Sequence, residues 1–402
     1  MGKQGKSVVI GVMVLAMAAG SVGSMMGGRP PPQTEGAERG QGTDADIEAI
    51  DMLPLANEAE TAAFGVELAA QLALPNPDMD FDAVVALDQI AIRALSPELS
   101  PEVQARFARG VTGNRGRVPQ FVEQIHSRVQ SGARLKYLGT TAREEHTVAR
   151  FRLVDLEGGV DFLDLLIGIQ SRRPVIVDSY SLMVGWQSEL YADFFHVGVL
   201  EHAVDASEIT ALGEAARDEE YEEVLRLYDA LPEAAQSLRS IWAVRIAAAG
   251  ASDNVERYMA ILDEFTTQFP NDRAAQMQLL DVHLEREQWA AASADVDALD
   301  DSFPDPYWNG HRATIAEGQG EYALALELAE ALIQADPTLF DGPDVALSAS
   351  LATGDLERAN GFATTLRDDF GLDLAELATQ PGYEAIAQLP VFAAQPADPT
   401  QP

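Results

Sequence analysis

A recurrence of residue types every 33 or 34 positions constrains this chain more than any other feature of its sequence. Each unit carries an aromatic residue or a leucine, an alanine three positions later and, in most units, a closing proline. The recurring positions are Trp289, Tyr322 and Leu356; Ala292, Ala325 and Ala359; and Pro270, Pro304 and Pro337. A period of this length predicts stacked helical units in the second half of the chain.

Within a unit, the spacing predicts two closely packed helices. Gly320 and Gly354 stand where the first helix of a pair would end, because glycine readily takes the left-handed conformation that closes a helix. Tyr322 or Leu356 follows two residues later and is expected to start the second helix and to pack against the first. The alanines three positions further on are small enough to let two helices approach. Glu287 stands where the other units have glycine.

The glycine, aromatic, alanine and proline at these offsets resemble the tetratricopeptide repeat, whose unit is about 34 residues long. Residues 205–371 would form the array, and the first two pairs are degenerate, with Tyr221 and Trp242 as their best anchors. The expected helix pairs cover residues 206–235, 238–270, 272–304, 306–337 and 341–371.

The resemblance implies a right-handed superhelix whose concave face binds peptides or other proteins. Tyr307 and Trp308 lie on a first helix, and two interpretations stay open: they contact a partner in the groove, or they belong to the core. Some proteins of this family clamp a carboxylate with lysines, but this chain has no lysine after Lys136. Residues 372–392 are expected to form a helix that caps the last apolar face, and residues 393–402 a disordered tail.

The negative charge is concentrated in the repeats. The net charge of the chain is −37, which makes nucleic-acid binding unfavourable. Residues 80–186 contain 13 acidic and 13 basic residues, whereas residues 205–371 contain 34 acidic and 10 basic ones, a net charge of −24. The charge either serves solubility alone or attracts a basic partner to the repeats.

The amino-terminal 28 residues have the composition of an export signal. Lys3 and Lys6 precede an uncharged, largely apolar run over residues 7–28, which predicts either an uncleaved transmembrane anchor or a cleaved signal peptide. Both place the remainder outside the cytoplasm of a bacterial cell: anchored in the inner membrane and facing the periplasm, or secreted or periplasmic after cleavage. Residues 29–43 are expected to form a disordered linker.

The middle of the chain predicts an α+β domain over residues 78–186. A helical segment over residues 44–75 precedes it, and a connecting helix over residues 187–204 follows. Helical spacing gives way to four strand-like runs that form an antiparallel meander. The predicted strands cover residues 134–143, 147–155, 160–170 and 174–184. The order of elements resembles cystatin-like and NTF2-like domains, which implies a pocket between helix and sheet.

No motif predicts an enzyme, a cofactor or a metal site. The chain has no cysteine, and it lacks phosphate-binding and nucleophile-elbow motifs. Four acids, Asp155, Glu157, Asp161 and Asp164, surround one predicted hairpin, where exposed turn residues are expected. Asp78, Asp80 and Asp82 imitate the start of a calcium loop but are better explained as helix caps. His196 and His202 are wrongly spaced for a zinc protease.

These observations predict an exported, membrane-tethered, non-enzymatic scaffold whose repeats bind a protein or peptide, and a basic partner is the one that the charge of the repeats would attract. The alternative is a small-ligand-binding module in the α+β domain, with the repeats as its support.

Overall fold

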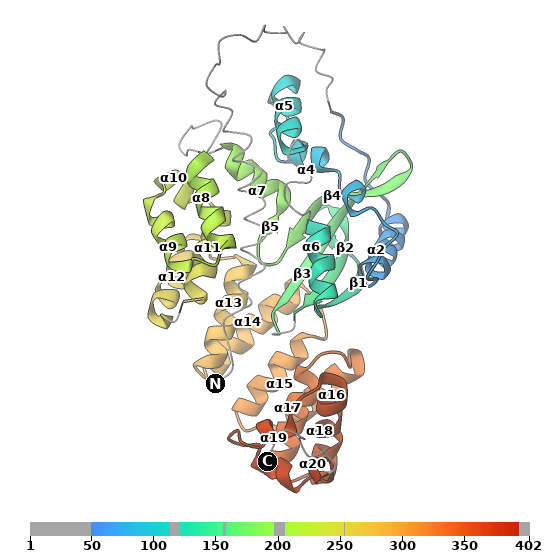
Figure 1. Cartoon of the computed structure of the whole chain (residues 1–402), viewed down its shortest axis with the longest axis vertical. Helices are drawn as coiled ribbons and strands as arrows, with labels where there is room; N and C mark the ends of the chain where they lie inside the picture. Colours follow the sequence, from blue (N-terminus) through green and yellow to red (C-terminus); the bar gives the residue numbers. More distant parts are fainter. Residues whose placement is uncertain (1–49, 113–120, 156–157, 197–205, 253, 394–402) are drawn as a thin grey trace, which may run out of the picture. The chain divides into compact units, whose positions relative to one another are not determined.

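The computed structural model describes residues 50–112, 121–155, 158–196, 206–252 and 254–393 (Figure 1). The chain divides into two compact units, with the boundary between Pro270 and Asn271. The first unit contains an antiparallel sheet with helices before and after it, and the second unit is helical where it is described. The predicted class, an α+β region followed by an all-α region, is therefore confirmed.

The sheet is a meander in the order β1-β2-β3-β4-β5, with every neighbouring pair antiparallel. A four-stranded meander was expected, and the fifth strand is an addition of only two residues that pairs with β4. Its strands are β1 Arg134–Arg143, β2 His146–Val154, β3 Val160–Gln170, β4 Arg173–Ser181 and β5 Gly185–Trp186. Gly185 has φ +91°, a conformation that glycine adopts without strain, and this turns the chain back along β4.

Helices surround this sheet. They are α2 Glu58–Leu72, α3 Phe81–Val84, α4 Leu87–Arg93, α5 Pro101–Thr112, α6 Phe121–Gln130 and, after the sheet, α7 Gln187–Phe194. The apolar spacing over residues 81–95 predicts one helix, but the structure breaks it at Val85 and Ala86. Val85 forms a parallel bridge with Ile176, and the Ala86 amide donates to the Ile176 carbonyl at 2.9 Å. Pairing with β4 therefore replaces one helical turn.

Both faces of the sheet are buried. Ala149, Phe151 and Leu153 share one face, as their alternation predicts, and all are buried. The alternation also predicts a polar face for Arg150 and Arg152, yet these side chains are only 5% and 2% exposed. Segments before and after the sheet cover this face as well, so its arginines lie inside the domain.

The remaining helices follow α7, and those of the second unit pack in consecutive pairs. In the first unit they are α8 Ala206–Arg217, α9 Tyr221–Ala230, α10 Glu233–Gln236, α11 Arg239–Gly250 and α12 Val255–Gln268. In the second unit they are α13 Arg273–Glu285, α14 Trp289–Ser302, α15 Trp308–Gly318, α16 Tyr322–Ala335, α17 Asp341–Thr353 and α18 Leu356–Phe370. Helix α13 packs with α14, α15 with α16, and α17 with α18; α15 also packs with α17.

The chain after α18 differs from the single capping helix expected over residues 372–392. It forms three short pieces, α19 Leu374–Leu377, the 3-10 helix η2 Glu384–Gln388 and α20 Pro390–Ala393. Leu374, Leu377, Ile386 and Leu389 are buried with Leu366 of α18 in one apolar cluster. These short pieces thus cover the last helix pair.

The predicted inner-membrane anchor and periplasmic placement are corrected. None of the helices in the described ranges combines the length and the apolar character needed to cross a bilayer. The segment that carried the prediction, residues 7–28, lies outside the described residues, as do the expected linker over residues 29–43, most of the tail over residues 393–402 and part of the connecting helix over residues 187–204. The transmembrane and signal-peptide assignments are therefore not retained.

Helix α2 packs on the sheet through a glycine. An added Cβ at Gly65 would lie 2.4 Å from the Tyr137 ring, which itself packs on the Phe151 ring with centroids 5.2 Å apart. Glycine inside a helix costs roughly 1 kcal/mol relative to alanine. This close contact explains why the position accepts that cost.

We expect Gly65→Ala to lower the free energy of unfolding by about 1–3 kcal/mol, because the new methyl group overpacks this contact. The matched control is Gly361→Ala in α18, where an added Cβ meets nothing within 4 Å, so stability should rise by roughly 0.5–1 kcal/mol. Calorimetric melting temperatures of the two variants and the parent chain test this. Equal shifts in both variants would contradict the packing explanation.

Candidate functional site

The two aromatic residues that were candidates for partner binding lie in the core. Tyr307 and Trp308 are 1% and 0% exposed. The Trp308 indole donates to the Phe303 carbonyl at 2.7 Å, and both rings pack edge-on against His311. Burial lowers the pKa of His311 to about 4, so this imidazole is neutral near pH 7. The cluster anchors the start of α15 and presents no aromatic surface to a partner.

The small repeat-packing residues lie where paired helices meet. Ala292, Ala325 and Ala359 are each 0% exposed. Trp289 of α14 is half-buried and lies against Gly318 of α15, where an added Cβ would come within 2.4 Å of its ring. This contact joins one helix pair to the next.

The turns between paired helices use left-handed residues. Gly320 and Gly354 have φ +79° and +75° after the first helices α15 and α17. Glu287, at the corresponding place after α13, adopts φ +55° although it is not glycine. Tyr322 is half-buried, whereas Leu356 is 41% exposed, so Leu356 contributes less packing than expected.

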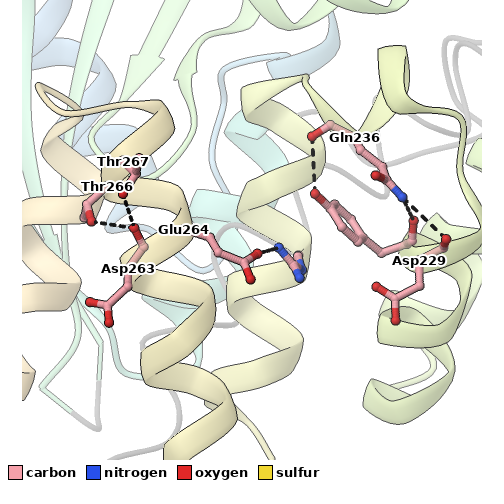
Figure 2. Close-up of polar contacts among 8 residues, drawn as sticks. Asp229, Gln236, Asp263, Glu264, Thr266 and Thr267 are labelled. Atoms are coloured by element: carbon pink, nitrogen blue, oxygen red, sulfur yellow. Dashed lines mark hydrogen bonds and ion pairs between the residues drawn. The ribbon is translucent and has the colours of Figure 1, made fainter.

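Of the two anchors expected in the earlier helix pairs, Trp242 is buried and Tyr221 is half-buried. The Arg245 guanidinium lies 4.5 Å from the ring centroids of both Tyr228 and Trp242, and it pairs with Glu264 at 2.6 Å. Figure 2 shows Glu264 in this pairing and Gln236 bonded back to α9. The chain's own arginine therefore supplies the cation of this aromatic cluster.

The first candidate site is an acidic cluster on α15 and α17. Ser348 of α17 donates a hydrogen bond to Glu317 of α15, and the Tyr383 hydroxyl donates to Asp344 at 3.5 Å. Asp341 lies one turn before Asp344 at the start of α17. All three acids are half-buried. They come from the two first helices α15 and α17, and Tyr383 reaches them from the segment that follows α18.

The charge of this acidic cluster is not compensated. Burial, followed by the negative charges of Asp341 and Glu317, raises the pKa of Asp344 to about 7. Burial also raises the pKa of Glu317 and of Asp341. In the described part of the second unit, Arg312, Arg358 and Arg367 pair with acids of the second helices instead. No ion pair neutralises the cluster itself among the described residues.

The second candidate site is a cleft of about 420 Å³ in the α+β domain. Its apolar lining includes Ile92 and Leu95, at and just beyond α4, Leu166 of β3 and Trp186 of β5. Charged side chains share this lining: Arg93, Glu144, His146, Asp178 and Glu189. Its volume falls within the range of small-molecule pockets, roughly 300–1,000 Å³. No sequence motif marks this cleft, because its lining comes from seven separate segments.

Asp178 fixes one wall of the cleft. It is 4% exposed, and its carboxylate accepts hydrogen bonds from the Ser179 amide at 2.9 Å, from the Ser188 amide at 3.1 Å and from the Ser188 hydroxyl. A strand residue thereby caps the first turn of α7, where amide groups lack helical partners. Burial raises the pKa of Asp178 to about 6 despite these bonds.

Arg93, the last residue of α4, brings a positive charge into this lining. Its Nε is buried without a hydrogen-bond partner, and burial lowers the pKa of the guanidinium. Asp178 is close enough to oppose this shift, but its bonds go to Ser179 and Ser188. Within the described residues, Arg93 has no direct anionic partner.

A second charged group lies around Trp186. The Trp186 indole points to Glu144, with 3.4 Å between Nε1 and Oε1. Burial, and to a lesser extent the charge of Glu144, raises the pKa of Glu189, against a backbone hydrogen bond at Trp186 and the positive charge of Arg239. Two carboxylates thus repel each other beside an indole ring.

The acids around the β2–β3 hairpin do not form one exposed group. Asp155 accepts from the Gly159 amide at 2.7 Å, as a turn residue should, and Glu157 lies outside the described residues. Asp161 and Asp164, by contrast, are 0% exposed, and they lie on opposite faces of β3. Asp164 forms ion pairs with Arg143 and Arg150, whereas Asp161 accepts from the Ser181 hydroxyl at 2.8 Å.

The other sequence candidates behave as structural residues. Asp80 caps α3 by accepting from the amides of Asp82 and Ala83 at 3.1 and 3.2 Å. His202 lies outside the described residues. Over the ranges that the structure covers, no three acids, histidines or cysteines are grouped so as to hold a metal ion.

Comparison with known proteins adds no relative. No family model, curated protein or solved structure matches this chain. The function must therefore be inferred from the two candidate sites themselves.

Buried Asp161 makes stability depend on pH. Burial raises its pKa from 3.8 to about 7. Between these values the folded chain binds more protons than the unfolded chain, so this group's contribution to stability falls as pH rises and is lost above its folded pKa. Asp161→Asn keeps a side chain of similar size that can still bond Ser181, and it should reduce the loss of melting temperature between about pH 4 and pH 7. The exposed Asp78→Asn is the control, and an unchanged slope in Asp161→Asn would refute the assignment.

Proposed function

We propose that the second unit is a protein-binding scaffold of tetratricopeptide type that receives a basic peptide segment of its partner. The observation that carries this proposal is the acidic cluster of Glu317, Asp341 and Asp344, which has no cationic partner among the described residues. A cationic side chain placed there would relieve the mutual repulsion of these carboxylates and compensate for their burial. Repeat arrays bind their partners through extended surfaces built from successive units.

The net negative charge of the whole second unit also supports a basic partner. From residue 271 to residue 402 the sequence has 24 acidic and five basic residues, a net charge of −19. A field of this sign increases the encounter rate with basic segments and repels acidic ones, especially at low ionic strength. The acidic cluster would then bind the basic segment that the negative charge of the unit attracts.

A direct binding measurement tests this proposal. Fluorescence anisotropy would compare a labelled arginine-containing peptide with an acidic peptide of equal length. The double variant Glu317→Gln/Asp344→Asn retains hydrogen-bond acceptors for Ser348 and Tyr383, and we expect it to bind the basic peptide about tenfold more weakly. The control, Glu327→Gln/Glu357→Gln, removes the same charge from exposed positions on α16 and α18. If both double variants lost the same affinity for the basic peptide, the effect would come from the net negative charge alone, and the proposed site would be rejected.

The proposal also predicts how binding depends on pH. The pKa of Asp344 is raised to about 7 by burial and by its acidic neighbours, so part of the cluster is protonated in slightly acidic buffer. Affinity for an arginine peptide should therefore increase between about pH 6 and pH 8 as Asp344 ionises, and this increase should flatten in Asp344→Asn. The groups facing Asp344 are Glu317, Asp341 and Tyr383, and none of them is cationic. A pH dependence that survives in Asp344→Asn would contradict this reading.

A further inference from the structure

We propose that the cleft of the α+β domain binds a small zwitterion: a molecule with a carboxylate at one end, an ammonium group at the other and a short apolar body, such as a free amino acid or a short peptide. This inference concerns the first unit and does not depend on peptide binding by the second unit.

The carboxylate is assigned to Arg93. A guanidinium stays charged when it is partly buried, and a desolvated charge without a hydrogen-bonded counterion is unfavourable. Arg93 lines the cleft with its Nε buried and without a hydrogen-bond partner. The nearby Asp178 carboxylate is already occupied by Ser179 and Ser188. A ligand carboxylate would supply the planar, bidentate partner that a guanidinium prefers.

A single negative charge fits this cleft better than a phosphate would. Three carboxylates share the lining with Arg93: Glu144, Asp178 and Glu189. A doubly charged group would be repelled by all three, whereas a carboxylate carries only one negative charge. The excess of acids over bases in the lining also requires a positive group on the same ligand.

The ammonium group is assigned to Glu144, Glu189 and Trp186. The two glutamates are close enough for the charge of one to affect the other, and Arg239 opposes only part of this effect. A ligand ammonium group beside them would add a second positive charge and reduce their repulsion. The Trp186 indole lies beside Glu144 and offers an aromatic face of the kind that attracts ammonium groups. The apolar body of the ligand would then contact Ile92, Leu95 and Leu166.

The first test uses the parent chain and small probes. Calorimetric titration would compare leucine and the dipeptide Leu-Leu with their N-acetylated and C-amidated forms. We expect at least one free zwitterion to bind, and each blocked form to bind about tenfold or more weakly, because each lacks one charge-assisted contact. Leucine and the dipeptide distinguish a free amino acid from a peptide as the source. Failure of both zwitterions to bind, or equal binding of the blocked forms, would overturn the proposal.

Two sets of variants test separately which residues bind the carboxylate end and the ammonium end of the ligand. Arg93→Gln should weaken the free zwitterion about tenfold but change the C-amidated probe little, and Arg93→Lys should restore part of the loss. Glu189→Gln should weaken the zwitterion while sparing the N-acetylated probe. Arg106→Gln, an exposed arginine on the nearby α5, is the control and should bind as the parent does. If Arg93→Gln does not fold, Glu189→Gln and the blocked probes still decide the outcome. If Arg106→Gln weakened zwitterion binding as much as Arg93→Gln does, the assignment of the ligand carboxylate to Arg93 would be rejected.

Discussion

The close approach of helices at small residues is the constraint on which the second unit depends. Ala325 is fully buried, and an added Cβ at Gly342 of α17 would lie 2.8 Å from Ile333 of α16. Such contacts let α15, α16 and α17 pack without intervening large side chains. The same packing brings Glu317 and Ser348 within hydrogen-bonding distance. The acidic cluster is therefore a consequence of helix spacing.

In the α+β domain, buried charged side chains fix how the strands and α7 are placed. Asp164 of β3 forms ion pairs with Arg143 of β1 and Arg150 of β2, and Asp178 caps α7 from β4. Removing one partner from such a group leaves an uncompensated charge, which is costly, so each group disfavours a shifted strand register. Asp178 also fixes where α7 starts and thus where Glu189 stands beside Trp186. This cap therefore positions the wall of the cleft that α7 contributes.

The two candidate sites differ in their electrostatic design. The acidic cluster lies in a unit with a large negative charge, and so its partner is expected to be attracted from a distance. The cleft lies in a region whose acidic and basic residues balance, and it places both signs in one small volume. This difference is the basis for proposing a basic macromolecular segment as the partner of the first site and a small ligand with both charges as the ligand of the second.

Several features of the fold could be predicted from local sequence, because they depend on contacts between near neighbours. Alternation of apolar residues located β1, β2 and β3 to within one residue at each end, and glycine marked the ends of α15 and α17. Features that depend on what covers an element could not be predicted. Arg150 alternates like a solvent-facing residue but is buried, and Trp308 lies in the core although its position on the helix also allowed a groove-facing role.

The candidate sites were the least predictable part. Arg93, Glu144 and Asp178 lie far apart in the sequence and share no motif, and Glu317 meets Asp344 only because α15 packs with α17. The sequence by itself determined the repeat period, the order of helices and strands and the concentration of negative charge, since these follow from composition and short-range periodicity. Only the tertiary structure decided which charges lack a partner, because burial and pairing depend on side chains brought together from distant segments.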